Sequence, residues 1–231
     1  MTLKAVLFDF NGVIINDEPL HEHLIKQLLI EENLRAKPEE FQTFCLGRSD
    51  RACLRDFLNN QGRVVSEEYL DRLIHRKSQA YLQQLESLET LPIYPDTEKF
   101  ISNVQAANLT MAVVSGAIRS EVELVLNRAN LASYFPIIVA GDDITTSKPE
   151  PDGYLLAIER LNQFDPNLNL HPAECLAIED TWAGIQSAQN AGISVVGVAH
   201  TYPFHMLQRW ANWCIDDLSD LEFERIQKSY E

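Results

Sequence analysis

The chain is poor in positive charge. It contains 19 Lys and Arg residues against 34 Asp and Glu residues, which gives a formal net charge of -15 at pH 7. Proteins that bind nucleic acids usually carry a basic patch or stripe, and this sequence has no cluster of Lys and Arg. The composition therefore argues against a nucleic-acid partner. Any anionic substrate would need a locally positive site.

Cysteine is scarce, and long apolar runs are missing. The cysteines lie apart, with no Cys-x-x-Cys pair: Cys45, Cys53, Cys175 and Cys214. We expect them to be reduced packing residues of an intracellular protein. No apolar run approaches the roughly 20 residues that span a bilayer, and no pattern of a signal peptide precedes the first predicted strand. We expect a cytoplasmic protein without membrane contact, as a monomer or weak dimer.

An apolar run interrupted by an acidic residue opens the chain. Residues 5–14 are apolar apart from Asp9, Asn11 and Gly12. The first part of the run is typical of a buried strand in a parallel sheet, followed by a loop at its carboxyl end. Ligands of open α/β sheets bind just outside these ends, so Asp9 is a candidate for chemistry. The alternative is that Asp9 simply ends the strand as a turn residue.

The rest of the sequence divides into a helical part and an alternating part. Residues 20–89 show helical periodicity and no convincing strand, which predicts a block of roughly four helices. From residue 90 onward, strands are expected at 109–115, 134–140, 175–178, 194–198 and 213–215, with helices between them. This alternation predicts an α/β fold with a doubly wound, Rossmann-like parallel sheet. Residues 1–15 and 90–231 would form this core domain, and residues 16–89 an inserted all-helical domain that covers the active site.

Polar and charged residues follow the predicted strands at their carboxyl ends. They are Asp9, Asn11, Ser115, Gly116, Glu179 and Asp180, with Lys148 in the loop after the third strand. In a doubly wound sheet these ends converge on one crevice. Carboxylates suit Mg²⁺, a hydroxyl and N–H groups at a helix start suit a phosphate, and a lysine neutralises its charge. Each residue alone could be a helix cap or an exposed lysine, but their joint position favours a phosphate site.

These motifs, taken in order, resemble the haloacid dehalogenase superfamily, in particular its phosphatase and β-phosphoglucomutase-like branch with a helical cap. The resemblance extends over nearly the whole chain. The matching segments are 9–14, 18–21, 113–116, 141–143, 148–152, 179–185, 188–192 and 195–198.

The resemblance implies a nucleophile and a metal site. Asp9 would attack phosphorus and form an aspartyl-phosphate. Asp9 and Asp180 would bind Mg²⁺ directly, Glu179 directly or through water, and Asn11 through its backbone carbonyl.

The resemblance also implies how a small phosphorylated substrate is held. The groups expected to hold the phosphoryl oxygens are Ser115, the N–H of Gly116 and Lys148. The residues expected to face the rest of the substrate are His21, Arg48 and Arg51, the last two in the segment 47–51.

One position departs from the pattern of the family. Its phosphatases carry a second aspartate where this chain has Asn11, and that aspartate protonates the leaving oxygen and later activates water. An amide has no proton to exchange at neutral pH, and general acid–base catalysis contributes about 10²–10⁴-fold in rate. The sequence therefore predicts a competent site for Mg²⁺ and phosphate with impaired turnover, least impaired for acidic leaving groups. His21 or Asp17 are alternative bases.

Other functions remain as alternatives. A non-catalytic pseudo-phosphatase that binds a phosphorylated ligand would explain Asn11, but clustered charges cost stability unless they are paired or bind a metal. A sugar-phosphate mutase would need acid–base help even more than a phosphatase. A dehalogenase needs no metal and usually has Tyr at position 11, and a phosphonate hydrolase needs a cap lysine where Asp50 stands.

Overall fold

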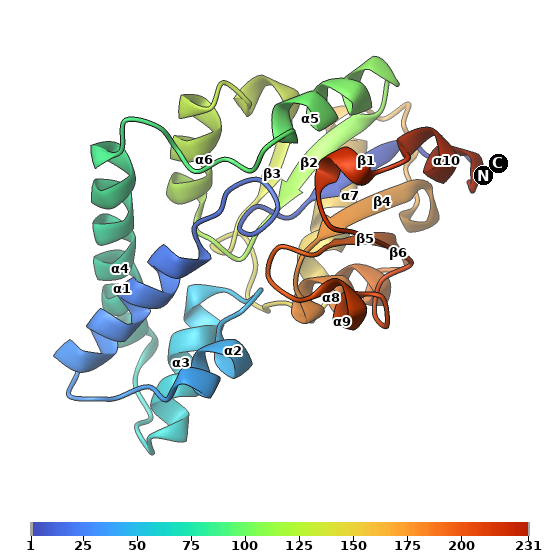
Figure 1. The fold of residues 1–231 in the computed structure, drawn as a ribbon. Coiled ribbons are helices and arrows are strands. Elements are labelled where there is room, and N and C mark those ends of the chain that lie inside the picture. Colours follow the sequence, from blue (N-terminus) through green and yellow to red (C-terminus); the bar gives the residue numbers. More distant parts are fainter. Residues whose placement is uncertain (1, 231) are drawn as a thin grey trace.

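The computed structural model describes residues 2–230 and has a six-stranded parallel sheet at its centre (Figure 1). The strands are β1 (Ala5–Phe8), β2 (Thr110–Val114), β3 (Ile137–Val139), β4 (Cys175–Glu179), β5 (Ser194–Val198) and β6 (Trp213–Ile215). Their spatial order is β3-β2-β1-β4-β5-β6. The order reverses between β1 and β4, and ligands of such sheets bind at this switch point. The predicted doubly wound fold is confirmed.

Helices cover both faces of the sheet. They are α5 (Thr97–Ala106), α6 (Arg119–Arg128), α7 (Asp152–Phe164), α8 (Trp182–Asn190), α9 (Phe204–Leu207) and α10 (Phe223–Lys228). Val6 and Phe8 of β1 face the core shared with α5, α6 and α10, whereas Ala5 and Leu7 face the core shared with α7 to α9. Because both faces of β1 are buried, its sequence is continuously apolar.

One strand is shorter than its pattern suggests. The apolar run 134–140 yields only Ile137–Val139 as strand, because a 3₁₀ turn at Ala132–Tyr134 and then Pro136 precede it. Proline has no N–H to donate to a neighbouring strand, so it does not extend β3 into the sheet.

A helical block lies between β1 and α5 and forms a separate layer beside the sheet (Figure 1). Its helices are α1 (Glu18–Glu31), α2 (Pro38–Phe44), α3 (Asp50–Asn60) and α4 (Glu67–Ser87). Ser49 and Ser66 start α3 and α4, and each hydroxyl accepts a hydrogen bond from the N–H three residues later. The block has a core of its own, with Ile25, Leu28, Phe41, Leu54, Phe57 and Leu73 among its members. None of the helices in residues 2–230 has the length and apolar character to cross a membrane.

The expectation that all cysteines are reduced is wrong for two of them. Cys45 at the end of α2 and Cys53 in α3 form a disulfide, with their Cα atoms 4.6 Å apart, whereas Cys175 and Cys214 are free. The turn at Gly47, which has φ +71°, folds the two helices back toward each other. Sequence separation alone did not show this approach. The bridge closes the loop that contains residues 47–49.

Reduction of this disulfide should lower the free energy of unfolding by about 2–3 kcal/mol, because opening a loop of this size restores conformational entropy to the unfolded chain. The measurement is urea denaturation with and without dithiothreitol. The double variant Cys45→Ser, Cys53→Ser is the control and should be insensitive to the reductant. Titration of four reactive thiols in the denatured, unreduced protein would contradict the bridge.

Candidate active site

Asp9 stands at the carboxyl end of β1 and is buried. Its N–H donates to the carbonyl of Ile178 at 3.0 Å, which extends the pairing of β1 with β4 by one residue. The carboxylate oxygen Oδ1 accepts a hydrogen bond from the N–H of Phe10 at 2.7 Å and lies 2.9 Å from Nζ of Lys148. Two contacts on one oxygen fix the orientation of the carboxylate at the switch point of the sheet.

Lys148 reaches this point from the loop between β3 and α7. Its Nζ also lies 2.7 Å from Oε1 of Glu179, and the hydroxyl of Tyr154 donates to the same oxygen at 2.6 Å. Burial opposes the charged form of Lys148, but Asp9 and Glu179 outweigh it and raise the pKa of the lysine. The ammonium therefore stays charged beneath the site.

Three buried carboxylates lie close together at the ends of β1 and β4. Asp9, Glu179 and Asp180 each place an oxygen within 4.8 Å of the others. Burial and the charge of Asp9 raise the pKa of Glu179 to about 8 and the pKa of Asp180 well above its usual value. Glu179 Oε2 and Asp180 Oδ1 are buried, and within residues 2–230 neither has a hydrogen-bond partner. Lys148 supplies one positive charge for three carboxylates, so a further cation would be needed to neutralise the cluster when all three are ionised.

The donor set fits Mg²⁺. All the donors are hard oxygens, which Mg²⁺ prefers, and an ion held by them would satisfy the unpartnered oxygens of Glu179 and Asp180. Gly12 keeps this space open, because it adopts φ +77° and a Cβ there would fall 1.9 Å from Oδ2 of Asp180. The hydroxyl of Thr201 donates to that same oxygen.

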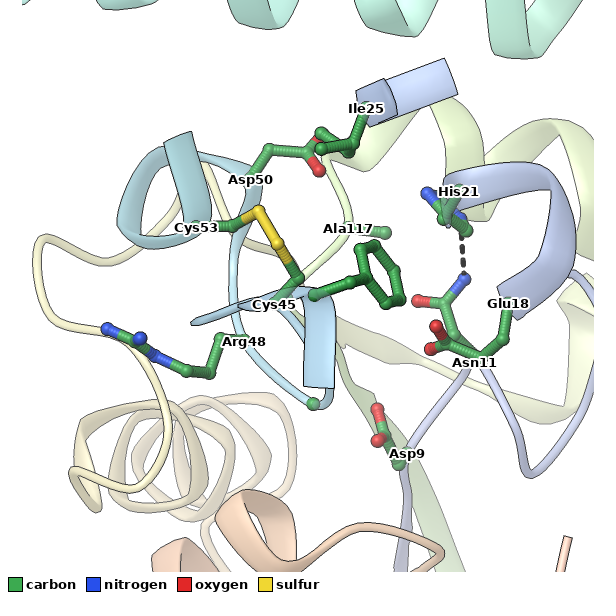
Figure 2. Close-up of a pocket in the computed structure, with 13 residues that line it drawn as sticks. Asp9, Asn11, Glu18, His21, Ile25, Cys45, Arg48, Asp50, Cys53 and Ala117 are labelled. Atoms are coloured by element: carbon green, nitrogen blue, oxygen red, sulfur yellow. Dashed lines mark hydrogen bonds between the residues drawn. A yellow bond between two sulfur atoms is a disulfide. The ribbon is translucent and has the colours of Figure 1, made fainter. Parts of the chain in front are cut away.

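Asn11 is anchored by a polar network at the base of α1 (Figure 2). Its amide Nδ2 lies 3.1 and 3.0 Å from the two carboxylate oxygens of Asp17, and 3.1 Å from Nε2 of His21. The hydroxyl of Tyr81 in α4 donates to Asp17, which is buried. Although burial opposes ionisation, the contacts with His21, Tyr81 and Asn11 lower the pKa of Asp17. The amide of Asn11 is thus in direct contact with a buried carboxylate, that of Asp17.

The loop after β2 brings Ser115 and Gly116 to the same edge. Ser115 is buried, and its hydroxyl lies 3.4 Å from Oδ1 of Asn11 and accepts a hydrogen bond from the N–H of Ala117 at 3.0 Å. A Cβ on Gly116 would lie 2.9 Å from the backbone of Arg48, so only glycine lets the helical block approach this closely. The N–H of Ser49 donates to the hydroxyl of Ser147 at 2.8 Å. Residues 47–49 therefore cover the carboxyl ends of the strands.

A pocket opens between the helical block and these strand ends. Figure 2 shows Asp9 at its base, with Asn11, Glu18 and His21 on one side and the disulfide on another. The lining residues are Asp9, Asn11, Glu18, His21, Ile25, Phe41, Cys45, Gly47, Arg48, Asp50, Cys53, Gly116 and Ala117. The pocket is thus lined both by Asp9 of the core and by residues of the helical block that would contact a substrate.

Comparison with known proteins agrees with this arrangement. A model of the haloacid dehalogenase-like hydrolase family matches residues 6–198. The chain belongs to this family. It is 28% identical over 224 residues to Protein CbbY of Rhodobacter capsulatus, covering 95% of each chain, and 26% identical over 200 residues to a phosphorylated carbohydrates phosphatase of Thermotoga maritima, covering 86% of this chain and 87% of the other. A crystal structure of β-phosphoglucomutase from Clostridium difficile superposes with a TM-score of 0.84 at 24% identity, covering 99% and 97% of the two chains.

The structure brings most of the predicted site residues of this hydrolase together, but places the two arginines differently. Arg48 lines the pocket, yet its NH1 pairs with Asp56 at 2.7 Å and its guanidinium points away from Asp9 (Figure 2). Arg51 is not among the lining residues, and its guanidinium pairs with two acidic residues at the start of α4, Glu67 and Asp71. The resemblance indicated the segment 47–51 that holds both arginines but could not show their ion pairs.

The structure adds two residues to the site that the sequence left without a role. Glu18 lines the pocket beside Asn11, and burial raises the pKa of its carboxyl to about 7. Its place directly before Pro19 at the start of α1 was the only signal in the sequence. Tyr154 lies in α7, on the face of the sheet that α7 and α8 cover, and its hydroxyl donates to Glu179. Helical periodicity in the sequence indicates only that Tyr154 is a core residue.

Proposed function

We propose that this hydrolase is a Mg²⁺-dependent phosphatase of small phosphorylated metabolites, sugar phosphates included, that works through an aspartyl-phosphate at Asp9. The observation that supports this most is the cluster of Asp9, Glu179 and Asp180 beside Lys148, with Asp9 at the base of the pocket. The name of the Thermotoga maritima relative supports phosphorylated carbohydrates as the substrate class. Residues 16–89 would serve as the cap domain over this site.

The side chains of the chain divide the work of phosphoryl transfer. Because Oδ1 of Asp9 is held by Phe10 and Lys148, its other oxygen is the one free to attack phosphorus in line. Lys148, the hydroxyl of Ser115 and the N–H of Gly116 would hold the phosphoryl oxygens and balance their charge. Asp9, Glu179, Asp180 and the carbonyl of Asn11 would hold Mg²⁺, which supplies charge neutralisation for the phosphoryl group when bound.

Asn11 limits this scheme at the proton-transfer steps. The leaving alcohol needs a proton, and the water that hydrolyses the aspartyl-phosphate must lose one. The amide of Asn11 can orient these groups but cannot exchange a proton at neutral pH. We therefore expect slow turnover, and slower for alkyl than for aryl esters, because an aryloxide leaves without protonation.

A second candidate is a non-catalytic protein that binds a phosphorylated ligand. The contact of Asn11 with Asp17 supports this candidate, because the amide donates hydrogen bonds to a buried carboxylate and fits the surrounding polar network. A sugar-phosphate mutase ranks lower, because its two phosphoryl transfers both need an acid–base group at this position.

Release of phosphate from p-nitrophenyl phosphate tests the phosphatase. We expect release that requires Mg²⁺, stops with EDTA and falls to background in Asp9→Asn, because the amide is not a nucleophile for phosphorus. Asp152→Asn, a change in the first turn of α7 away from the pocket lining, is the matched control and should keep the native rate. Ligand-induced thermal stabilisation by phosphate esters with no release from any of them would favour the binding protein instead.

A further inference from the structure

The pocket above Asp9 is lined on its far side by apolar and acidic groups. The apolar members are Ile25, Phe41, Ala117 and the disulfide of Cys45 and Cys53. The acidic members above Asp9 are Glu18 and Asp50. This is the side that would receive the leaving group of a phosphate ester whose phosphoryl group lies against Asp9.

The cations of the helical block around this pocket are paired with carboxylates. Arg48 pairs with Asp56 at 2.7 Å. Lys77 is fully buried, 2.8 Å from Asp50 and 3.5 Å from Glu121 of α6. These pairs leave neither Arg48 nor Lys77 with spare positive charge toward the pocket.

The pairing extends to the remaining cations nearby. Arg51 pairs with Glu67 and Asp71, and His21 lies 3.3 Å from Asp17. Burial lowers the pKa of His21, but the carboxylates of Asp17 and Glu121 outweigh it and raise the pKa above its usual value. Within residues 2–230, each of these cations around the far side of the pocket therefore has a carboxylate partner. A second anion would find no unpaired cation there.

The loop after β2 supplies no unpaired cation to the pocket either. Ala117 follows Gly116 and has no polar side chain, and the next residue, Ile118, packs against the core of the helical block. Arg119 then pairs with Asp143 and Glu123. Lys148 lies next to Asp9 at the base of the pocket, and its contacts with Asp9 and Glu179 hold it for the phosphoryl group that reacts.

We infer that this site takes phosphate monoesters of uncharged alcohols with an apolar face and rejects substrates that carry a second phosphate. A second phosphate would lose its hydration beside Glu18 and the apolar side chains of Ile25 and Phe41 without gaining an unpaired cation, which is unfavourable. An uncharged leaving group would instead cover the side chains of Ile25 and Phe41. This inference rests on the proposed phosphatase function and narrows it to one class of ester.

A matched pair of substrates tests the inference. Fructose 6-phosphate and fructose 1,6-bisphosphate differ by one phosphate, and we expect kcat/KM for the monophosphate to exceed that for the bisphosphate at least 10-fold. The ratio should shrink with added salt, because salt screens the repulsion. If turnover is too slow to compare, calorimetric dissociation constants of the same two sugars with Mg²⁺ present should show the same order.

Two variants connect the preference to the paired cations. Asp56→Ala frees the guanidinium of Arg48 and should lower KM for the bisphosphate at least fivefold while KM for the monophosphate stays within twofold. Glu67→Ala removes one of the two acidic partners of Arg51, which lies outside the lining, and should change neither value.

The outcomes separate the two proposals. Rates or dissociation constants for the two sugars within threefold of each other would overturn the inference and leave the phosphatase intact. An unchanged bisphosphate KM in Asp56→Ala would overturn it as well, whatever the result for Glu67→Ala. Failure of the phosphatase itself would show as no Mg²⁺-dependent release from any ester, p-nitrophenyl phosphate included.

Discussion

Exchanging the two side chains of one hydrogen bond, Asn11→Asp with Asp17→Asn, should raise phosphate release from alkyl esters by about 10²–10⁴-fold, the usual contribution of a general acid–base group. In the native chain the amide of Asn11 faces the pocket and the carboxylate of Asp17 lies behind it, 3.0 Å away. The exchange moves the carboxylate forward and keeps volume, net charge and the hydrogen bond. The hydroxyl of Tyr81, which donates to Asp17, would donate to the new amide oxygen.

The single substitution Asn11→Asp should raise the rate less than the exchange does. It places a second carboxylate about 3 Å from that of Asp17, and two carboxylates this close cannot both ionise, so the new acid titrates out of its useful range. Asp17→Asn alone is the control and should give no gain. Initial rates with an alkyl and an aryl phosphate measure the effect, and the gain should be larger for the alkyl ester.

Equal rates for the exchange variant and the native protein would contradict this account of Asn11. Proton transfer would then have to come from a group already present, and His21, 3.1 Å from the amide, is the first candidate.

Replacing Lys148 by methionine should lower the free energy of unfolding by about 3–5 kcal/mol in the absence of Mg²⁺, the usual cost of removing one partner of a buried ion pair. Lys148 is buried and lies 2.9 Å from Asp9 and 2.7 Å from Glu179. Its loss leaves three carboxylates within 4.8 Å of one another without their positive neighbour. Mg²⁺ should restore part of the stability by taking over that neutralisation.

The loss in Lys148→Met should grow as the pH rises above 8. Burial and Asp9 already raise the pKa of Glu179 to about 8, so the folded state binds a proton that the unfolded state, with a pKa near 4.5, has released. Between these two values the folded state holds more protons, and its stability falls with increasing pH. Removal of the ammonium raises the pKa of Glu179 further, so in the variant this loss of stability continues above pH 8, where it levels off in the native protein.

Urea denaturation at pH 7 and pH 9, with EDTA or with Mg²⁺, measures these effects. Lys148→Arg keeps the charge and is the matched control, although its planar guanidinium will not reproduce both contacts. Native-like stability of Lys148→Met in EDTA at pH 9 would show that the carboxylates do not repel one another as the structure implies.

Much of the fold could be predicted because, along most of this chain, the local pattern of apolar and polar residues matches the secondary structure that forms. The strands β2, β4, β5 and β6 lie within about a residue of their predicted ends, since they are buried apolar runs bounded by helices. The position of Asp9, Ser115, Glu179 and Asp180 also followed from the sequence, because the carboxyl ends of parallel strands lie at one edge. The shorter β3 reflects Pro136, whose effect on pairing depends on the neighbouring strand.

Contacts between the helical block and the core could not be predicted. The pairing of Lys77 with Asp50 and Glu121 joins residues 27 and 44 positions apart, and no periodicity relates them. The disulfide, the role of Glu18 and the ion pairs of the two arginines belong to the same group.

The sequence by itself determined the parallel sheet, the residues at its strand ends and the departure at position 11, because these depend on local periodicity and residue type. Only the tertiary structure decided what surrounds that departure. It places the Asp17 carboxylate behind the Asn11 amide and pairs every nearby arginine with an acid, because both depend on distances between elements that the order of residues does not encode.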